Sequence, residues 1–293
     1  MGIFDWLKKS KRDSGHTIDD LASRMGVTVD DLQQVEATYE TVHIPKRRGG
    51  TRTLAVPNPM LKFYQRRMLH RVLARLRSHA CATGFEKGHS IVSNAAFHAG
   101  QDVVIRMDIR DFFTSTDGAR LKKYVYGMGW NRDASAMFVK LCTFENGLPQ
   151  GAPTSPRLSN LVNIGMDHAL SHMAHTVGAR YTRYADDMTF SYSGPAVDYV
   201  VATVIRGVVW TTQAFGYQVH MRKKLHVRHR HQRQIVTGLV VNDGVNLPRS
   251  TRRWLRAVEH NMKYGRPTTI SEDQLRGWQS YRAMVEQMSS GEV

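Results

Sequence analysis

The sequence is poor in cysteine, with two among 293 residues. Cys81 and Cys142 are far apart, lie in apolar surroundings and form no Cys-x-x-Cys pair. This spacing excludes a small domain stapled by disulfides. We expect both thiols to be small core residues of a protein that works in a reducing compartment.

The sequence also lacks a long uninterrupted apolar run. Its longest apolar stretch, residues 200–215, is broken by Arg206 and Gln213, and its branched residues recur with helical spacing. That pattern predicts an amphipathic helix packed on a sheet rather than a membrane span. The N-terminus has no apolar signal-peptide region and no Ser or Thr at position six for myristoylation, so we expect a cytoplasmic protein without a membrane partner.

Acidic residues are scarce relative to basic ones. The chain has 41 Lys and Arg but 25 Asp and Glu, which gives a formal net charge of +16. Such an excess indicates a polyanionic partner or an acidic membrane surface, and the lack of a membrane segment favours nucleic acid. The length suffices for one multi-lobed unit with two or three subdomains.

Two adjacent carboxylates, Asp186 and Asp187, stand out against this shortage of acid. Their flanks, 181–184 and 188–192, have the pattern of half-buried strands, which predicts a hairpin with residues 185–187 as its turn. Two like charges side by side repel each other unless a cation relieves them. A cation site and a solvated acidic turn therefore both explain the stretch, and other parts of the chain must decide between them.

Two stretches upstream favour the cation site. Residues 103–108 alternate as a strand that delivers a carboxylate at its end, Asp108. Residues 146–156 form a loop rich in Gly and Pro, followed by an apolar helix from Pro156 to about Met173. A loop of this composition brings backbone close to a ligand.

Taken together and in this order, the stretches resemble the motifs of reverse transcriptases. The motifs are the strand-end Asp108, the loop Gln150-Gly151-x-Pro-x-Ser-Pro and the hairpin Tyr184-Ala-Asp-Asp. Each motif alone is weak, whereas the ordered set is specific.

Two more elements resemble one branch of that family. Asn94-Ala-x-x-His98 precedes the first acid, and Val236-Thr237-Gly238 follows the last palm motif. This is the combination found in retron reverse transcriptases. Without the resemblance, Asn94 and His98 would be interpreted as a helix-capping pair and Gly238 as a turn.

The resemblance covers the chain from about residue 40 onward and implies an α+β right-hand polymerase, with an antiparallel palm sheet, fingers and a helical thumb. A small N-terminal helical pair, opening at Thr17 and Thr28, precedes it. Its acidic and neutral side chains favour a packing pair over a DNA-reading helix-turn-helix. The expected domains are an N-terminal helical extension over 1–38, fingers over 39–100, palm over 101–117, a connection between fingers and palm over 118–155, palm over 156–239 and thumb over 240–293.

The resemblance also implies a metal site. In this family Asp108, Asp186 and Asp187, with the backbone oxygen of Ile109, would hold two Mg2+ ions. Carboxylate oxygens suit such hard cations. One ion would lower the pKa of the primer hydroxyl, and the other would hold the triphosphate and stabilise the leaving pyrophosphate.

The incoming nucleotide is placed by the same resemblance. A basic hairpin over 41–56 would close over its triphosphate, and Phe113, five positions after Asp108, would exclude a 2'-hydroxyl. The alternatives are a solvated loop for the hairpin tip, a solvated strand end for Lys223 and a core position for Phe113. The expected nucleotide-binding residues are Lys46, Arg52, Asp111, Phe112, Phe113, Gln150, Gly151 and Lys223.

RNA binding is expected along basic helices and at the two retron-like elements. A helix over 61–78 carries five arginines between apolar positions and suits a nucleic-acid channel, although a solvated face would look similar. Basic residues interleaved with tryptophan after residue 248 suit a thumb laid along a duplex. The expected RNA-binding residues are Asn94, His98, Val236, Thr237, Gly238, Arg252, Arg253, Trp254 and Arg256.

The resemblance implies a function with named partners. Retron reverse transcriptases copy one structured non-coding RNA with dNTPs into branched RNA-DNA, called msDNA, starting from the 2'-hydroxyl of an internal guanosine. They serve in bacterial anti-phage defence, usually with an effector protein. No ribonuclease H motif set follows the palm motifs, so we expect RNA removal by a host ribonuclease H.

Two other interpretations stay open. A group II intron or diversity-generating reverse transcriptase would carry the same acids, although no maturase-like extension follows the thumb. A non-catalytic RNA-binding protein on a polymerase scaffold belongs to a different class, and the intact acids argue against it. Metal-dependent incorporation of labelled dNTP would separate the enzyme from the binding protein.

Overall fold

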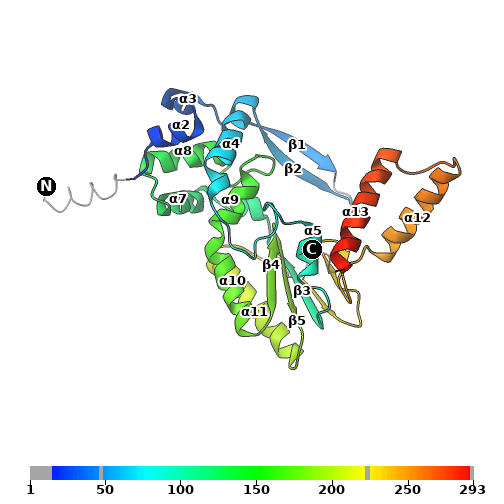
Figure 1. Cartoon of the computed structure of the whole chain (residues 1–293). Helices are drawn as coiled ribbons and strands as arrows, with labels where there is room; N and C mark the ends of the chain where they lie inside the picture. Colours follow the sequence, from blue (N-terminus) through cyan, green and yellow to red (C-terminus); the bar gives the residue numbers. More distant parts are fainter. Residues whose placement is uncertain (1–14, 46–48, 222–224, 291–293) are drawn as a thin grey trace, which may run out of the picture. The chain divides into compact units, whose positions relative to one another are not determined.

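The computed structural model describes residues 15–45, 49–221 and 225–290 of the chain (Figure 1). The chain combines groups of helices with antiparallel strands, so the fold class is α+β, as the sequence predicted. The chain forms two units, each built from two segments. The first unit contains Met1–His79 and Arg110–Gly165, and the second contains Ala80–Ile109 and Met166–Val293.

Short capped helices and a hairpin make up the first unit. Thr17 and Thr28 each form a capping box with the aspartate at the third helical position, which starts the N-terminal helices where the sequence predicted them. The elements are α2 (Ile18–Met25), α3 (Val29–Gln34), β1 (Tyr39–Pro45), β2 (Thr51–Pro57), α4 (Pro59–Arg71), η1 (Leu73–Arg75), α6 (Phe112–Ser115), α7 (Gly118–Gly127), α8 (Arg132–Cys142) and α9 (Ser155–Val162).

The N-terminal helical pair packs into the core of the first unit. Leu21, Met25 and Leu32 are fully buried in one cluster with side chains of α4, α7 and α8. Lys140 of α8 donates a 2.7 Å hydrogen bond to the carbonyl of Gln33 in α3. These contacts confirm that the pair is a packing element.

Two helices are shorter than the sequence predicted. The helix expected over 61–78 ends at Arg71, where the 3-10 turn η1 follows. The helix expected from Pro156 to Met173 is divided at Asn163 into α9 and α10. The Asn163 amide donates a 2.8 Å hydrogen bond to the Ser159 carbonyl, and such local bonds of asparagine compete with helical geometry.

An antiparallel sheet with the order β4-β5-β3-β6 forms the centre of the second unit. Successive residues of each strand point to opposite faces. Arg183 on one face is bonded to Asp167 of α10, whereas Thr182 on the other face is bonded to His98, which follows α5. The strands and helices concerned are β3 (Val103–Asp108), β4 (Arg180–Tyr184), β5 (Asp187–Tyr192), β6 (His226–His229), α5 (Ile91–Ala96) and α10 (Ile164–Thr176).

The amphipathic helix predicted over 200–215 is α11 (Val197–Ala214), which lies along the sheet with α10 (Figure 1). It buries Val200, Val204 and Val208 and contacts β5. None of the helices in the described ranges has the length and apolarity that crossing a membrane requires. Cys81 and Cys142 are free and buried, which confirms the prediction that they are core residues.

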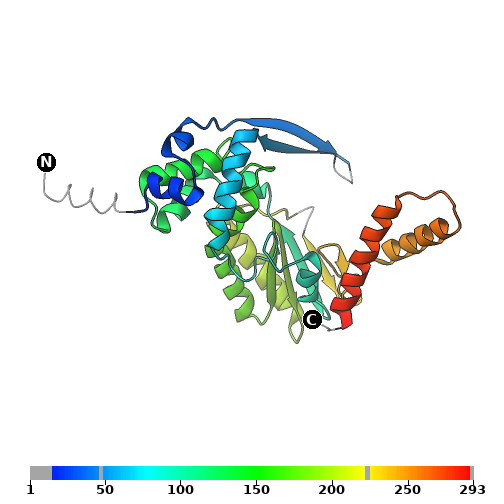
Figure 2. The same cartoon turned by 45° about the horizontal axis from the view of Figure 1, so that its top comes forward.

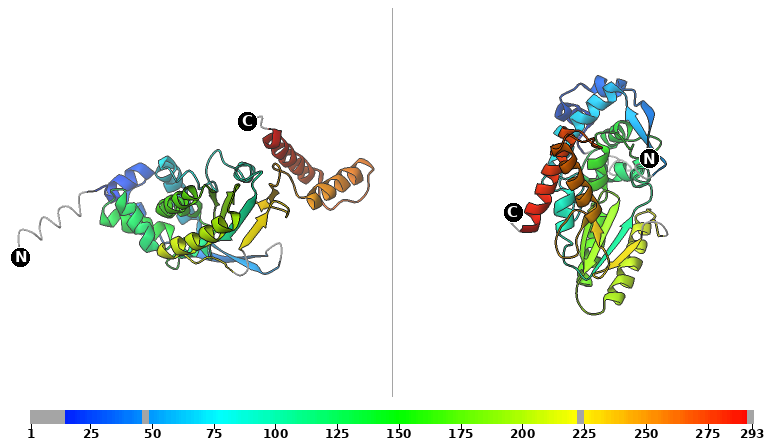
Figure 3. Two further views of the ribbon diagram at one scale, coloured as in Figure 1. Left: turned by 90° about the horizontal axis from the view of Figure 1, so that it is seen from below. Right: turned by 90° about the vertical axis from the view of Figure 1, so that its right-hand side faces the viewer.

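The C-terminal part of the second unit is a short hairpin followed by two helices (Figures 2 and 3). Val285 of the last helix packs with Val92 of α5 and with Val236 and Leu239 of the hairpin. The last helix is therefore anchored on α5. The elements are β7 (Ile235–Val236), β8 (Leu239–Val240), α12 (Arg249–Lys263) and α13 (Glu272–Ser290).

Candidate active site

The aspartates predicted as catalytic lie at one end of the sheet of the second unit. Asp108 ends β3, and its register partner is Asp187, the first residue of β5 rather than part of the turn. Asp186 lies in the turn, and its carbonyl accepts a 2.9 Å hydrogen bond from the Ile109 amide. Strand pairing thus brings together acids from two distant parts of the sequence.

Arg106 forms an ion pair with Asp187 across β3 and β5. Its Nε lies 3.3 Å from Asp187 Oδ1, and its Nη2 lies 2.5 Å from Oδ2. Its Nη1 donates a 3.3 Å hydrogen bond to the carbonyl of Ile235. Both side chains of the pair are partly buried, so solvent screens them less than at an open surface. Arg106 therefore supplies part of the positive charge that two adjacent carboxylates need.

The donor atoms at this end of the sheet suit a hard divalent cation. Asp108, Asp186 and Asp187 supply carboxylates, and Ile109 supplies a backbone carbonyl next to them, which is the oxygen chemistry such a cation prefers. Among the described residues, no three His, Cys, Asp or Glu side chains are gathered around one point. The Asp187 carboxylate contacts the Arg106 guanidinium. The residues fit a divalent metal in donor type and backbone placement.

The predicted nucleotide-binding loop lies against the β1–β2 hairpin within the first unit. The Ala55 amide donates a 2.9 Å hydrogen bond to the Gln150 carbonyl. Gly151 has a φ of 134°, and a Cβ added there would lie 2.8 Å from the Ala55 carbonyl oxygen, so the position requires glycine. Arg52 is exposed on β2. Two further predicted residues, Lys46 and Lys223, lie outside the described residues.

Three predicted nucleotide-binding residues that come shortly after the first acid, Asp111, Phe112 and Phe113, belong to the first unit. Asp111 has a φ of 47° at the start of α6, and its carboxylate accepts a 3.2 Å hydrogen bond from Arg110. Phe112 is 3% exposed and fits a core position, whereas Phe113 is half-buried. Their ring centroids are 5.6 Å apart. Phe113 therefore keeps the accessible surface that a steric role toward a ligand requires.

Two side chains predicted to bind RNA are buried in the second unit. Asn94 is 1% exposed, and its Oδ1 accepts a 2.7 Å hydrogen bond from the Thr83 hydroxyl. His98 is 0% exposed, with Nδ1 2.7 Å from Ser191 Oγ and Nε2 2.8 Å from Thr182 Oγ1. A side chain without exposed surface cannot touch RNA, so burial corrects the expectation of direct contact. His98 instead joins β4 to β5.

His98 makes this bridge as a neutral ring. Burial, with a smaller contribution from the charge of Arg180, lowers the pKa of His98 to about 3. A neutral imidazole has one donor and one acceptor nitrogen, so it can donate to one of the two hydroxyls and accept from the other. The histidine is therefore a structural link between the two strands of the hairpin that carries Asp186 and Asp187.

The predicted element 236–238 forms the turn of the β7–β8 hairpin. Thr237 and Gly238 have φ values of 46° and 89°, as a tight two-residue turn requires. Val236 is fully buried, and the Thr237 hydroxyl donates a 2.7 Å hydrogen bond to the Ile91 carbonyl at the start of α5. The two retron-like elements therefore pack on each other. Burial corrects the expectation of RNA contact for Val236, whereas Thr237 is half-buried and Gly238 is exposed.

Helix α12 presents arginines to solvent, as predicted. Arg252, Arg253 and Arg256 are exposed, while Trp254 is half-buried against Trp278 of α13 with ring centroids 5.3 Å apart. The opposite side of α12 contributes fully or largely buried residues to a small core. The arginines are therefore accessible to a polyanion, and Trp254 holds the helical pair together.

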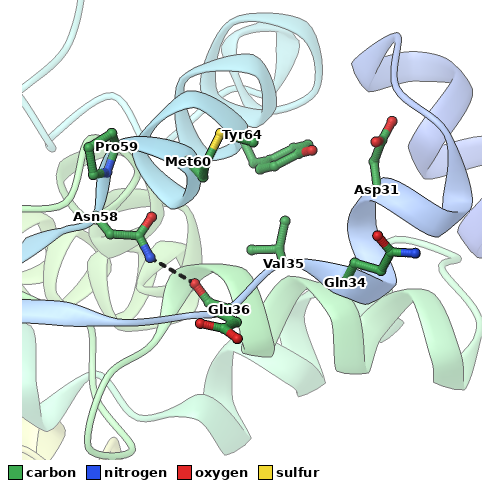
Figure 4. Close-up of a pocket in the computed structure, with 8 residues that line it drawn as sticks. All are labelled: Asp31, Gln34, Val35, Glu36, Asn58, Pro59, Met60 and Tyr64. Atoms are coloured by element: carbon green, nitrogen blue, oxygen red, sulfur yellow. Dashed lines mark hydrogen bonds between the residues drawn. The ribbon is translucent and has the colours of Figure 1, made fainter.

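A pocket in the first unit is lined by none of the candidate catalytic residues Asp108, Asp186 and Asp187 (Figure 4). It is formed where α3, α4 and the intervening chain meet, and the Asn58 amide donates a 3.0 Å hydrogen bond to the Glu36 carbonyl across it. Burial raises the pKa of Tyr64, one of its lining residues. The lining residues are Asp31, Gln34, Val35, Glu36, Asn58, Pro59, Met60 and Tyr64.

Sequence reasoning missed three charged residues around the aspartates. Arg106 stands on a strand that is otherwise apolar before its terminal acid, in the alternation that places it on the same face as Asp108. Asp167 is a lone acid in α10, and Arg183 lies in β4, two residues before the turn that begins at Ala185. A charge on an otherwise buried face was the signal that could have selected each of them.

The fold and the paired acids define a class of protein, and comparison with known families agrees with it. The sequence model described as reverse transcriptase (RNA-dependent DNA polymerase) matches residues 44–237, which include Asp108, Asp186 and Asp187. The chain belongs to the reverse transcriptase family.

Within that family, the chain belongs to the retron reverse transcriptases. It is 35% identical to the Retron Mx162 reverse transcriptase of Myxococcus xanthus, over 91% of this chain and 63% of that protein. It is 34% identical to the Retron Mx65 reverse transcriptase of the same organism, over 92% of this chain and 68% of that protein. It is 30% identical to the Retron Ec86 reverse transcriptase of Escherichia coli, over 94% and 86% respectively. The chain thus spans less than two thirds of the length of the Mx162 relative.

Solved telomerase structures share the fold. The truncated apo telomerase of Candida tropicalis matches with a TM-score of 0.50 and 14% identity, over 72% of this chain and 55% of that chain. The telomerase of Candida albicans, in complex with a fragment of telomeric RNA, matches with a TM-score of 0.51 and 10% identity, over 88% and 54%. At these identities the likeness concerns the right-hand polymerase fold alone.

Proposed function

We propose that the chain is an RNA-directed DNA polymerase of the retron type, which copies a structured RNA into DNA with dNTPs. The observation that carries the proposal is the pairing of Asp108 with Asp187 at the ends of β3 and β5, beside Asp186, in a chain that belongs to the retron reverse transcriptases. A binding protein would have no use for three acids at one strand end of a basic chain.

The residues of this end of the sheet have distinct tasks in the proposal. Asp108, Asp186 and Asp187, with the backbone oxygen of Ile109, would hold two Mg2+ ions, whose chemistry would be to lower the pKa of the primer hydroxyl and to stabilise the leaving pyrophosphate. Arg106 orients the Asp187 carboxylate through two hydrogen bonds.

The proposal also assigns roles toward the incoming nucleotide. Gln150 and Gly151 pack along the incoming nucleotide, and Arg52, with Lys46 and Lys223, neutralises its phosphates. Asp111 and Phe112 shape the segment after the first acid, and Phe113 excludes a 2'-hydroxyl. The close approach of the Gly151 loop to β2 supports this grouping, because it ties Gln150 to the strand that carries Arg52.

The substrate and partners follow from the family in the proposal. The template is a structured non-coding RNA, synthesis starts from the 2'-hydroxyl of an internal guanosine, and the product is branched msDNA. Exposed arginines of α12 and the turn at Thr237 and Gly238 bind the RNA. A host ribonuclease H removes template, and an effector protein completes an anti-phage system in the cytoplasm. Similarity to the retron reverse transcriptases of Myxococcus xanthus and Escherichia coli supports the retron assignment.

The test begins with the DNA beside the gene, which is sequenced to find a structured inverted repeat. The RNA transcribed from it is incubated with the purified chain, Mg2+ and labelled dNTPs, with Asp108→Asn as the inactive control. Label should enter a product that resists strong denaturation and shortens after treatment with a 2'-5' debranching enzyme.

Each other outcome of this test has a definite meaning. Label in a linear product that extends an added primer would support a group II intron-like or diversity-generating enzyme instead. RNA binding without metal-dependent incorporation on any template would overturn the polymerase and leave a non-catalytic RNA-binding protein.

A further inference from the structure

A fully buried ion pair lies directly behind the catalytic hairpin. Arg183 of β4 and Asp167 of α10 are both 0% exposed. Arg183 Nε lies 2.7 Å from Asp167 Oδ1, and Nη2 lies 2.6 Å from Oδ2. Arg183 is three residues before Asp186 in sequence, so the pair is close to the acids without being part of them.

A buried ion pair needs an explanation other than stability. Removing two charges from water is so unfavourable that apolar side chains of similar size often stabilise a fold as well or better. The pair between Arg183 and Asp167 is bidentate, which fixes the guanidinium in one orientation. What the third guanidinium nitrogen, Nη1, binds indicates the task of the guanidinium.

The Nη1 nitrogen of Arg183 contacts the turn that carries the acids. Arg183 Nη1 donates a 2.9 Å hydrogen bond to the carbonyl of Ala185. Ala185 has a φ of 58°, the left-handed conformation that alanine rarely adopts. The hydrogen bond from Arg183 therefore stabilises a backbone geometry that the local sequence does not favour, at the residue before Asp186.

The chain packed on the edge of β4 holds the same turn. The Arg183 amide donates a 2.8 Å hydrogen bond to the Cys81 carbonyl, and the Thr83 amide donates a 2.9 Å hydrogen bond to the Arg183 carbonyl. A Cβ added to Gly84 would lie 2.7 Å from the Ala185 nitrogen, so the backbone of residue 84 packs directly on the turn. The turn is supported by backbone along its edge as well as by the guanidinium.

The two arginines near the acids act from opposite faces of the sheet. Arg183 pairs in register with Met188, whereas Arg106 pairs with Thr189. Met188 and Thr189 are adjacent in β5, and adjacent residues of a strand point to opposite faces of the sheet. Arg106 holds the Asp187 carboxylate itself. Arg183 holds the backbone from which Asp186 and Asp187 project.

We propose that Asp167 and Arg183 are positioning residues for DNA synthesis, a buried pair that fixes the turn so that Asp186 and Asp187 project correctly for metal binding. This role rests on the proposed polymerase function. Neither residue touches metal or substrate. Asp167 orients Arg183 through two hydrogen bonds, and the oriented guanidinium then holds the Ala185 carbonyl through a third.

Two variants test the pair. Arg183→Lys keeps the charge that Asp167 needs but loses the rigid fork that bonds Asp167 and Ala185 together. The double variant Asp167→Leu with Arg183→Met removes both charges, so no unpaired charge is left buried, and it also removes the bond to Ala185. Val204→Ala is the control, because it opens a small cavity in the same unit without touching the pair.

Two readouts separate positioning from stability. Mn2+ binding to the RNA-free protein is measured by the loss of its free-ion paramagnetic resonance signal, with Asp108→Asn as the reference for a damaged site. The Mg2+ concentration at half-maximal dNTP incorporation is measured on the RNA complex. Both variants should weaken Mn2+ binding about tenfold or more and raise the Mg2+ requirement, whereas Val204→Ala should lower the unfolding temperature and leave both metal values unchanged.

The results distinguish this inference from the proposed function. An unchanged Mn2+ affinity and Mg2+ requirement in either variant, once circular dichroism shows it folded, would overturn the positioning role. If the double variant does not fold, Arg183→Lys decides alone. If the wild-type chain makes no DNA but Arg183→Lys weakens Mn2+ binding, the polymerase proposal fails while the turn still depends on the pair.

Discussion

At the residue scale, the ion pair with Arg106 gives the two adjacent aspartates different surroundings. Asp187 meets a guanidinium through two hydrogen bonds, whereas the Asp186 backbone is bonded to Ile109. The planar guanidinium donates two parallel hydrogen bonds, so it holds the Asp187 carboxylate in one orientation. In the proposed enzyme this prepares the carboxylate for a metal ion.

Neutralising either adjacent acid should separate synthesis from RNA binding. Asp186→Asn or Asp187→Asn should abolish dNTP incorporation, because an amide is a much poorer ligand for a hard cation than a carboxylate. RNA binding, measured by filter retention at fixed salt, should persist. Asp186→Asn should not lower the unfolding temperature, because it removes repulsion between neighbouring carboxylates. An active double variant would end the metal-binding assignment.

Sugar discrimination should depend on Phe113 and not on its neighbour. Phe113→Ala should admit ribonucleotides while retaining dNTP use, and each tenfold loss in the ratio of kcat/KM would correspond to about 1.4 kcal/mol. Phe112 is nearly fully buried, so Phe112→Ala should instead cost about 3–5 kcal/mol of stability. An unchanged ratio in Phe113→Ala would remove the steric role, and a changed ratio in Phe112→Ala alone would transfer it to Phe112.

Protonation of His98 should make stability fall in acid. The pKa of His98 is about 3 in the folded chain and its ordinary value is 6.5, so the unfolded chain binds the proton first as pH falls. The contribution that the neutral His98 ring makes to the free energy of unfolding is fully present above pH 6.5 and is lost progressively toward pH 3. Between pH 7 and pH 5 this residue alone should remove about 2 kcal/mol.

Urea unfolding of the wild type and of His98→Gln at both pH values measures that contribution. Glutamine can still donate to one hydroxyl and accept from the other, but it does not titrate. The variant should therefore lose about 2 kcal/mol less than the wild type between the two pH values. Equal losses in both proteins would show that His98 is not held neutral.

At the scale of elements, local sequence patterns predicted β3 and α11, whose positions depend on the alternation or spacing of apolar residues. Alternation over 103–108 predicted β3 with its true ends, and the helical spacing of valines predicted α11. The missed boundaries, at Arg71 and Asn163, depend on a 3-10 turn and on a side chain that bonds to the preceding helical turn. Periodicity does not report either feature, because apolar residues continue with helical spacing beyond both points.

The contact between α13 and α5 gives a prediction about an element far from the acids in sequence. Val285 is 2% exposed and packs with α5 and the β7–β8 hairpin. Val285→Ala should cost about 1–3 kcal/mol and speed amide hydrogen exchange in 91–96 and 235–240. Exchange in α11 should not change. Val204→Ala, which thins the packing of α11, should give the opposite pattern, and equal acceleration everywhere in both variants would argue against separate local contacts.

At the scale of the whole molecule, the division of the chain was beyond the sequence. Fingers were expected over 39–100 and the first palm segment over 101–117, and these boundaries remain predictions. The structure joins Met1–His79 with Arg110–Gly165 in one unit and places Ala80–Ile109 in the other. Long-range packing decides such a division, and no local pattern carries it. The order of the motifs predicted the family correctly, because the chemistry of the reaction requires particular residue types at the acids whatever packs around them.

The last prediction concerns how the net charge of +16 acts on RNA. If binding depended on net charge alone, removing any three exposed cations would weaken it equally. Placement on α12 predicts otherwise. Substituting Gln for Arg252, Arg253 and Arg256 should lower affinity and reduce the slope of log Kd against log salt by about 2. The reason is that binding with fewer phosphate contacts releases fewer counterions from the RNA. Substituting Gln for Lys122, Lys123 and Arg132, exposed in the first unit, removes the same charge and is the matched control.

Kd values from 50 to 300 mM salt, for cognate RNA and a scrambled RNA of equal length, measure both slopes. Specificity should survive better than affinity, because phosphate contacts carry little sequence information. Equal slopes in the two triple variants would mean that α12 is not the RNA-contacting element.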